Sequence, residues 1–206
     1  MLKHNLQELP LVVAMTGASG AVYAVRLLEV LLEKECEVHL MISPSGAAVL
    51  KQELDRTVNL DRFDVRAMLP RITEGAGARL RYHHYEDLFA PLASGSFLTG
   101  GMVVCPCSGS TLSGIAHGAS NNLIQRAADV HLKERRKLIL VPRETPLSVI
   151  QLDNMKRAAE AGAVVLPAMP GWYHGVKAVQ DLVDFVVARI LDQLGVPHEL
   201  MRRWGK

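Results

Sequence analysis

A short glycine-containing turn near the start of the chain has the composition of an anion-binding loop. Gly17-Ala18-Ser19-Gly20 follows an apolar run and precedes an amphipathic stretch. A turn between a strand and a helix exposes backbone N–H groups at the helix N-terminus, where a phosphate can bind. The hydroxyl of Ser19 adds one more donor. The alternative is a tight strand-to-helix turn that binds no ligand.

Two further hydroxyl-bearing turns follow predicted strands. Ser43 comes directly after Leu40-Met41-Ile42, and the run Cys105-Pro106-Cys107-Ser108-Gly109-Ser110-Thr111 follows the third strand. Because the carboxyl ends of parallel strands meet at one edge of a sheet, these turns predict a ligand crevice there. Hydroxyl side chains also cap helix N-termini, and at least one of these is expected to be only a cap.

A dinucleotide-binding enzyme is the obvious rival, and two features argue against it. Ala21, Val22 and Tyr23 follow Gly20, so the third glycine of a G-x-G-x-x-G pattern is absent. An acidic residue that would hold the ribose is also missing, because Ser43 stands at the end of the second strand. Tyr173 and Lys177 have Y-x-x-x-K spacing, but the surrounding prolines and glycines predict a loop.

Several cations have spacings that suit a phosphate. Arg126, Asp129 and Lys133 lie at i, i+3 and i+7 of a predicted helix, where a salt-bridged solvent face is the simpler interpretation. Arg143 follows the fourth strand and is adjacent to Glu144, a candidate proton relay. Arg189 borders the apolar face of the last helix, a place for an anionic ligand, a partner chain or a solvated charge. Arg126, Lys133, Arg143 and Arg189 can together surround a phosphate monoester.

Nothing in the sequence predicts a metal site. No D-D-x-x-D run exists, and Asp181 and Asp184 fall opposite the apolar stripe of their helix, where they are expected to be solvated. Cys105 and Cys107 form a single C-x-C without a second ligand pair, so with Cys36 they are expected to be buried structural thiols. A metal-free site for a monophosphate is the consistent prediction.

Short apolar runs alternate with amphipathic stretches, which predicts an α/β fold with a parallel sheet covered by helices on both faces. Strands are predicted at Leu11–Met15, Val38–Ile42, Met102–Cys105, Leu138–Val141 and Ala163–Leu166. Helices are predicted at Ala21–Glu33, Gly46–Leu54, Ser110–His117, Asn122–Arg135, Ser148–Ala161 and Val176–Leu194. The segment Asp61–Gly77 is expected to be a loop or short helix.

Length and composition set the remaining bounds. A chain of 206 residues is expected to form one domain, 1–206, with terminal segments 1–9 and 198–206. Hydrophobic residues make up 49% and charged residues 21%, and a net charge of +2 points to neither nucleic acid nor a membrane surface. With no signal-like or membrane-spanning run, a cytoplasmic protein is expected. Trp204, near the end, is expected to pack on its own chain or on a partner.

Five stretches in this order resemble the flavin prenyltransferases, the UbiX-like family formerly described as aromatic acid decarboxylases. They are Met15-Thr16-Gly17-Ala18-Ser19-Gly20, Cys105-Pro106-Cys107-Ser108, Leu132-Lys133-Glu134-Arg135-Arg136, Val141-Pro142-Arg143-Glu144 and Pro170-Gly171-Trp172-Tyr173-His174. The likeness covers roughly Leu11 to Trp204. It implies a flavodoxin-like or Rossmann-like three-layer sandwich, assembled as a homododecamer with active sites between subunits.

The resemblance also implies roles for individual residues. FMN-binding positions are matched by Gly17, Ala18, Ser19, Ser43, Ser108, Gly109, Ser110, Thr111 and Arg143. Positions around the phosphate of dimethylallyl monophosphate are matched by Ser94, Gly95, Arg126, Lys133, Tyr173 and Arg189. Catalytic positions are matched by Ser19, Lys133, Glu144 and Trp204. The segment 56–85 has no usable match, and its role is left open.

The reaction so implied is a metal-independent transfer of a dimethylallyl group to N5 and then C6 of reduced FMN. The cations would stabilise the leaving phosphate, Trp204 would face an allylic cation, and Glu144 with Ser19 would move the C6 proton. The product, prenylated FMN, would pass to a UbiD-type decarboxylase, as in ubiquinone biosynthesis. Donor chain length and the choice between monophosphate and diphosphate are left open.

Two other functions compete with this interpretation. One is an FMN-dependent decarboxylase of an aromatic or cysteine-derived acid. Relatives that decarboxylate peptidyl-cysteine compounds carry P-x-M-N, whereas Pro167-Ala168-Met169 is followed here by Pro170, which disfavours that chemistry. The other is a non-enzymatic flavin carrier, which would need neither Glu144 nor Lys133.

Overall fold

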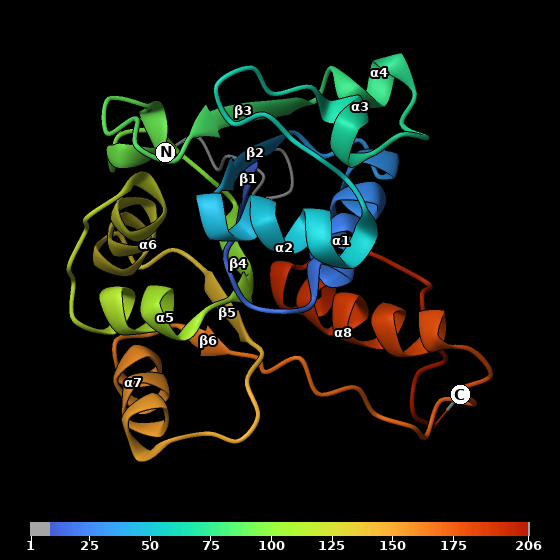
Figure 1. Ribbon diagram of the computed structural model, residues 1–206. Coiled ribbons are helices and arrows are strands. Elements are labelled where there is room, and N and C mark those ends of the chain that lie inside the picture. Colours follow the sequence, from blue (N-terminus) through green and yellow to red (C-terminus); the bar gives the residue numbers. More distant parts are fainter. Residues whose placement is uncertain (1–8, 206) are drawn as a thin grey trace, which may run out of the picture.

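The computed structural model describes residues 9–205 and is organised around one parallel sheet (Figure 1). Six strands are arranged in the order β3-β2-β1-β4-β5-β6. Their bounds are β1 Leu11–Met15, β2 Val38–Ile42, β3 Leu80–His84, β4 Gly101–Cys107, β5 Leu138–Pro142 and β6 Val164–Val165. This is the order of a doubly wound sheet, in which the chain reverses direction across the sheet between β1 and β4. The predicted α/β sandwich is confirmed.

Helices cover both faces of the sheet and bury a separate apolar cluster on each (Figure 1). One face is covered by α1 (Ala21–Glu33), α2 (Pro44–Leu54), α8 (Val179–Leu194) and the short α3 (Val65–Met68) and α4 (Glu74–Gly77). The other face is covered by α5 (Gly109–Ala116), α6 (Leu123–Lys133), α7 (Val149–Glu160) and the 3-10 turn η2 (Pro91–Ala93). Burial on both sides explains why the central strands are almost wholly apolar.

Most predicted elements are observed, and the differences have local causes. β1, β2 and α1 have the predicted bounds, and the Tyr173–Lys177 stretch lies outside any helix. β6 is shorter than predicted. α8 begins at Val179 instead of 176, because the Asp181 carboxylate accepts from the N–H groups of Lys177 and Ala178 and caps the helix there.

One strand was missed, and two predictions about individual residues need correction. The missed strand is β3, which lies within the segment 56–85 that had no match. Asp184 is not solvated, because its carboxylate accepts a hydrogen bond of 2.7 Å from Arg26 Nε of α1. Cys36 is only half-buried, whereas Cys105 and Cys107 are buried as predicted, and burial raises the pKa of the Cys107 thiol to about 12. Within residues 9–205, none of the helices is both long and apolar enough to cross a bilayer.

At Gly46, α2 lies directly against the backbone at the end of β1. A Cβ at this position would lie 2.7 Å from the backbone oxygen of Met15. Because that neighbour is backbone and cannot rotate away, Gly46→Ala is expected to destabilise the fold by about 1–3 kcal/mol. Thermal unfolding measures the effect. Gly75→Ala is the matched control, since nothing lies within 4 Å of its added Cβ, and an equal loss in both variants would contradict the prediction.

His131 of α6 is buried in its neutral form. Its Nδ1–H donates to Ala127 O at 2.7 Å, and its Nε2 accepts from the Thr99 hydroxyl at 2.8 Å. Burial lowers the pKa of His131 to about 4. Because the unfolded state then binds more protons, stability is full above the ordinary histidine pKa and declines as the pH falls towards 4.

We expect this histidine to contribute up to about 3 kcal/mol to the acid-induced loss of stability, the worth of a pKa shift of about two units. Urea unfolding at pH 7.5, 6 and 5, at fixed protein concentration, measures it. His131→Gln is expected to be less stable at pH 7.5 but to lose less stability on acidification. His117→Gln, at an exposed position, is the control and should keep the wild-type slope. An unchanged slope in the His131 variant would refute the assignment.

Candidate active site

The loops after β1 and β4 are joined by a single threonine at the point where the chain reverses direction across the sheet. Thr16 Oγ1 donates to Pro106 O at 2.7 Å and accepts from Ser108 N at 2.8 Å. The Thr16 N–H also donates to Pro106 O, at 3.2 Å. These three bonds fix the glycine turn of β1 beside the hydroxyl-rich turn of β4. The two loops that the sequence predicts to bind a ligand are therefore held side by side at the carboxyl edge of the sheet.

The hydroxyls around the predicted crevice cap two helices. Ser43 Oγ accepts from Gly46 N at 3.0 Å and caps α2, and Ser108 Oγ accepts from Thr111 N at 3.4 Å and caps α5. The expectation that at least one hydroxyl is a cap is confirmed. Ser108 Oγ also lies 3.2 Å from Ser110 Oγ and 3.1 Å from Thr111 Oγ1. Three hydroxyls thus cluster at the N-terminus of α5, which suits an oxyanion.

The N-terminus of α1 is occupied by the protein's own carboxylate. Glu53 of α2 accepts from Ala21 N at 2.8 Å and from Gly20 N at 3.0 and 3.1 Å, and the Ser19 hydroxyl also bonds to it. Burial alone would raise the pKa of Glu53. The hydrogen bonds from Ser19, Gly20 and Ala21 and the charge of Arg143 outweigh burial and hold this pKa below its ordinary value.

The glycine turn thus holds an anion in this structure, and that anion is the chain's own Glu53. The predicted role of the turn in binding a ligand stays a prediction. Sequence reasoning missed Glu53, because it lies more than thirty positions from its partners. An acidic residue close to the end of a predicted helix does not by itself indicate that its carboxylate binds the N-terminus of another helix.

Arg143 and Glu144 follow β5 at the same edge of the sheet. Arg143 Nε donates to Ser19 O at 3.2 Å, which brings its guanidinium beside the glycine turn. Glu144 is exposed, and its Oε1 accepts from the N–H of Thr145 at 3.0 Å. Both residues line a small cavity of about 50 Å³ with Met155, Pro167 and Met169. Arg143 and Glu144 thus lie together at the end of β5, and each has its hydrogen bond to a backbone group.

A second group of predicted residues lies on α6 and the segment before β4. Arg126 Nε donates to Ala93 O at 3.1 Å, and Arg126 Nη1 pairs with Asp129 at 2.9 Å. The exposed Lys133 pairs with Glu134 at 2.6 Å. Arg136 donates to the backbone oxygens of Gly95 and Phe97 and so ties the 94–97 segment to the end of α6. Ser94, Gly95, Arg126 and Lys133 therefore belong to one surface.

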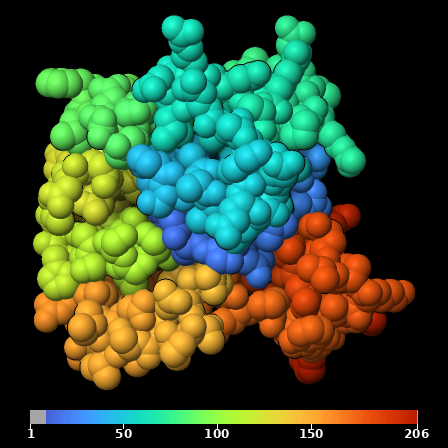
Figure 2. Space-filling model, in the orientation of Figure 1, coloured from blue at the N-terminus to red at the C-terminus, as the bar shows by residue number. Residues whose placement is uncertain are grey.

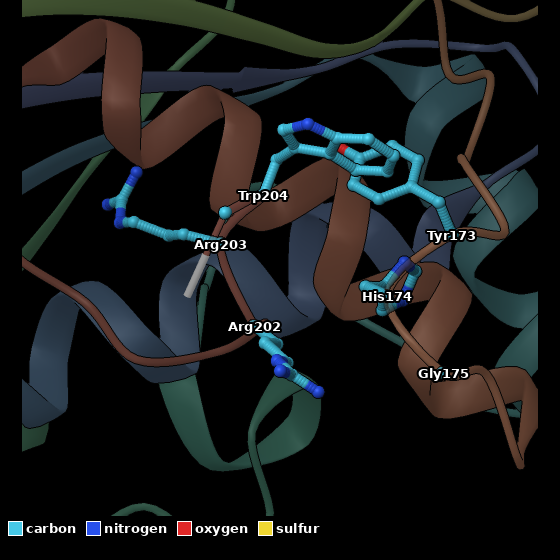
Figure 3. Close-up of a pocket in the computed structure, with 7 residues that line it drawn as sticks. Tyr173, His174, Gly175, Arg202, Arg203 and Trp204 are labelled. Carbon is cyan, nitrogen blue, oxygen red and sulfur yellow. The ribbon is translucent and has the colours of Figure 1, made fainter.

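A third group lies beside α8 and the C-terminal segment. Tyr173 and Trp204 meet edge to face, with ring centroids 5.3 Å apart (Figure 3). They line a cavity of about 660 Å³ with His174, Arg202 and Arg203. Arg189 pairs with Asp192 at 2.6 Å. Trp204 packs on its own chain as predicted, although 81% of its surface stays exposed.

The sheet separates the second group from the third. α6 and α8 cover opposite faces, and Figure 2 shows the yellow surface of α6 and the red surface of α8 on opposite sides of the molecule. Arg126 and Lys133 therefore cannot meet Arg189 around one phosphate within a single chain. The predicted cluster of four cations is wrong for one subunit, since spacing along the sequence does not reveal which face a helix covers.

Comparisons with known proteins give the family. A family model described as Flavoprotein matches residues 1–191. The chain is 51% identical to a flavin prenyltransferase UbiX of Pseudomonas aeruginosa over 94% of this chain and 92% of that protein. A crystal structure of AnUbiX in complex with FMN and dimethylallyl pyrophosphate is 40% identical, with a TM-score of 0.83 over 97% of this chain and 98% of that one.

A dodecameric FMN-dependent UbiX-like decarboxylase from Escherichia coli is 42% identical, with a TM-score of 0.82 over 96% of this chain and 100% of that one. Such identities over nearly the whole length, together with the strand order, show the family. This chain belongs to the flavoprotein family and, within it, to the UbiX-type flavin prenyltransferases.

Proposed function

We propose that the protein transfers a dimethylallyl group from dimethylallyl monophosphate to reduced FMN and so makes prenylated FMN for a UbiD-type decarboxylase. The observation that carries the proposal is the arrangement of the loops after β1, β4 and β5. Thr16 joins the glycine turn to the hydroxyl-rich turn before α5, and Arg143, next to Glu144 in the chain, bonds to Ser19 of the turn that holds Glu53. Anion-binding groups next to proton-accepting groups are what this transfer requires.

The donors at this edge of the sheet fit the phosphate of FMN. The α5 N-terminus offers the hydroxyls of Ser108, Ser110 and Thr111, and Arg143 offers a guanidinium at the adjacent strand end. Gly17, Ala18, Ser19, Ser43 and Gly109 complete the proposed cradle. Reduced flavin supplies the nucleophilic atoms, N5 and C6. The chain's own part is to hold the flavin by its phosphate and to keep Ser19 and Glu144 at its edge.

The donor phosphate is proposed to bind where copies of the chain meet. Because α6 and α8 cover opposite faces, Ser94, Gly95, Arg126 and Lys133 of one copy have to join Tyr173 and Arg189 of another. Large apolar side chains on α7 are exposed, which suits burial against another copy. We propose a homododecamer, in line with the dodecameric relative from Escherichia coli.

The protein's groups have distinct roles in the proposed reaction. Lys133, Arg126 and Arg189 stabilise the charge on the departing phosphate. Glu144 accepts the proton that leaves C6 of the flavin. Ser19, which is held by Glu53, orients the Glu144 carboxylate. Trp204 offers an aromatic face to the allylic cation.

The three cysteines are unpaired, as in proteins of reducing compartments, which supports a cytoplasmic location.

Mass spectrometry of the flavin tests the proposal directly. The purified protein is mixed anaerobically with reduced FMN and dimethylallyl monophosphate without added metal. The molecular mass of the extracted flavin is then measured. A gain of one five-carbon prenyl unit is expected. A parallel arm with the diphosphate donor measures donor preference. Tightly bound but unchanged FMN in both arms would overturn the proposal in favour of a carrier, and release of carbon dioxide from an aromatic acid would favour a decarboxylase.

A further inference from the structure

The carboxylate of Asp192 is the meeting point of α8 and the C-terminal segment. Its Oδ2 accepts from Arg189 Nη1 at 2.6 Å, while its Oδ1 accepts from Arg203 Nη2 at 2.9 Å and from His198 Nε2 at 3.1 Å. The His198 side chain is 1% exposed and that of Asp192 is 16% exposed. One largely buried acid thus binds a residue of the helix and two residues of the segment that follows it.

The C-terminal segment turns back along α8 to reach the candidate site. Gly195 ends the helix in the left-handed region with φ 74, and Val196 N donates to Leu191 O. The segment then passes His198 and Arg203 and ends with Trp204 against the Tyr173 ring (Figure 3). Tyr173 in turn meets Phe185 of α8 at 5.7 Å. The aromatic wall of the 660 Å³ cavity therefore depends on how this segment is anchored.

The charges explain why the anchor is a carboxylate. Arg189 and Arg203 are cations on either side of Asp192, and an uncharged residue between them would leave their repulsion unbalanced. Burial alone would raise the pKa of Asp192, but hydrogen bonds from Arg203 and His198 outweigh it and keep the carboxyl ionised. Charge-assisted bonds of this kind are shorter and stronger than neutral ones and fix geometry well.

We infer that Asp192 is a positioning residue that sets Arg189 and the 198–204 segment together, so that the donor-phosphate contact and the Trp204 wall form as one unit. The inference rests on the proposed function for the roles of Arg189 and Trp204. Asp192 itself touches neither flavin nor donor in this scheme. Its effect on the reaction passes through the residues it holds.

The test compares Asp192→Asn with Asp184→Asn. Both replace an acid of α8, but within residues 9–205 the hydrogen bonds of Asp184 join it to Arg26 and Gln180 and not to the C-terminal segment. Asp192→Asn is expected to raise the KM for dimethylallyl monophosphate about tenfold or more, the usual cost of losing a hydrogen bond to a charged group. The Kd for FMN is expected to stay at the wild-type value, and Asp192→Glu is expected to restore part of the donor affinity.

Two readouts follow the C-terminal segment without relying on catalysis. In a Trp172→Phe background Trp204 is the remaining tryptophan of the chain, so its fluorescence reports its contact with Tyr173. Trypsin cleavage after Arg202 or Arg203 reports how firmly the segment is held. Asp192→Asn is expected to change the fluorescence and speed cleavage, whereas Asp184→Asn leaves both unchanged. Arg203→Gln is expected to loosen the segment with a smaller rise in KM, because the Arg189–Asp192 pair remains.

The outcomes separate the inference from the proposed function. Wild-type donor KM, fluorescence and cleavage in Asp192→Asn would overturn the inference. A loss of FMN binding in step with a lowered Tm would also overturn it, since the residue would then be merely structural. If the wild-type protein makes no prenylated FMN, the proposed function fails, and the fluorescence and trypsin readouts still decide whether Asp192 anchors the segment.

Discussion

Replacing Glu144 by glutamine is expected to lower the formation of prenylated FMN by about 100- to 10,000-fold, the usual contribution of a positioned acid or base. The change keeps the size of the side chain and its acceptor for the Thr145 N–H, so the strand end should keep its shape. It removes the group that accepts the proton from C6. The affinity for FMN, which depends on the hydroxyl cluster and Arg143, is expected to stay the same.

Anaerobic single-turnover reactions followed by mass spectrometry of the flavin measure this effect. Glu35→Gln is the control, because Glu35 is an exposed glutamate paired with Arg79 in the turn between α1 and β2. Full activity in Glu144→Gln would show that the proton leaves by another route. Glu53, held by Ser19 and the α1 N-terminus, would then be the carboxylate to replace next.

Mixing two inactive variants is expected to restore activity. Lys133→Ala removes a group of the α6 surface, and Arg189→Ala removes a group of α8, which covers the opposite face of the sheet. If each site takes one group from each of two chains, a random one-to-one oligomer contains about one quarter of sites with both groups intact. Co-expression of the two variants with different affinity tags, followed by tandem purification and the flavin mass assay, measures the recovery.

A site built within one chain gives the opposite result, since every chain in the mixture carries one of the two changes. Activity at the level of the separate variants would therefore refute the shared site. Arg66→Ala mixed with Arg189→Ala is the matched control, because Arg66 is an exposed cation of α3, on the face of the sheet opposite to α6. That mixture should approach half of wild-type activity, as Arg66 is not part of the proposed site.

The sequence predicted the central fold well, because buried parallel strands are continuous apolar runs and their helices have a clear period. β3 escaped notice for the opposite reason. Leu80–His84 reads Leu-Arg-Tyr-His-His, pairs with β2 alone and is only partly buried, so it lacks an apolar run. The unmatched segment 56–85 therefore contributes the edge strand of the sheet.

The site could be predicted only where it follows from strand ends. Ser43, Ser108 and Arg143 follow predicted strands, and the structure places them along one edge. The contacts of Glu53 with the glycine turn, and of Asp192 with His198 and Arg203, join different elements, which no local pattern contains. The four predicted cations failed to assemble because residue spacing gives the face of a helix but not the face of the sheet that the helix covers.

Thr16 has a consequence for how such an enzyme can change. Its three bonds join the loops after β1 and β4, so the flavin cradle is completed by neighbouring strands of one chain. One copy's share of the surface proposed for the donor phosphate lies on α6 and the 94–97 segment. Neither element takes part in the three hydrogen bonds of Thr16. Substitutions there can alter the length or the phosphate number of the accepted donor and leave the flavin cradle intact. We therefore expect that substitutions on the proposed donor surface can change donor choice without changing flavin recognition.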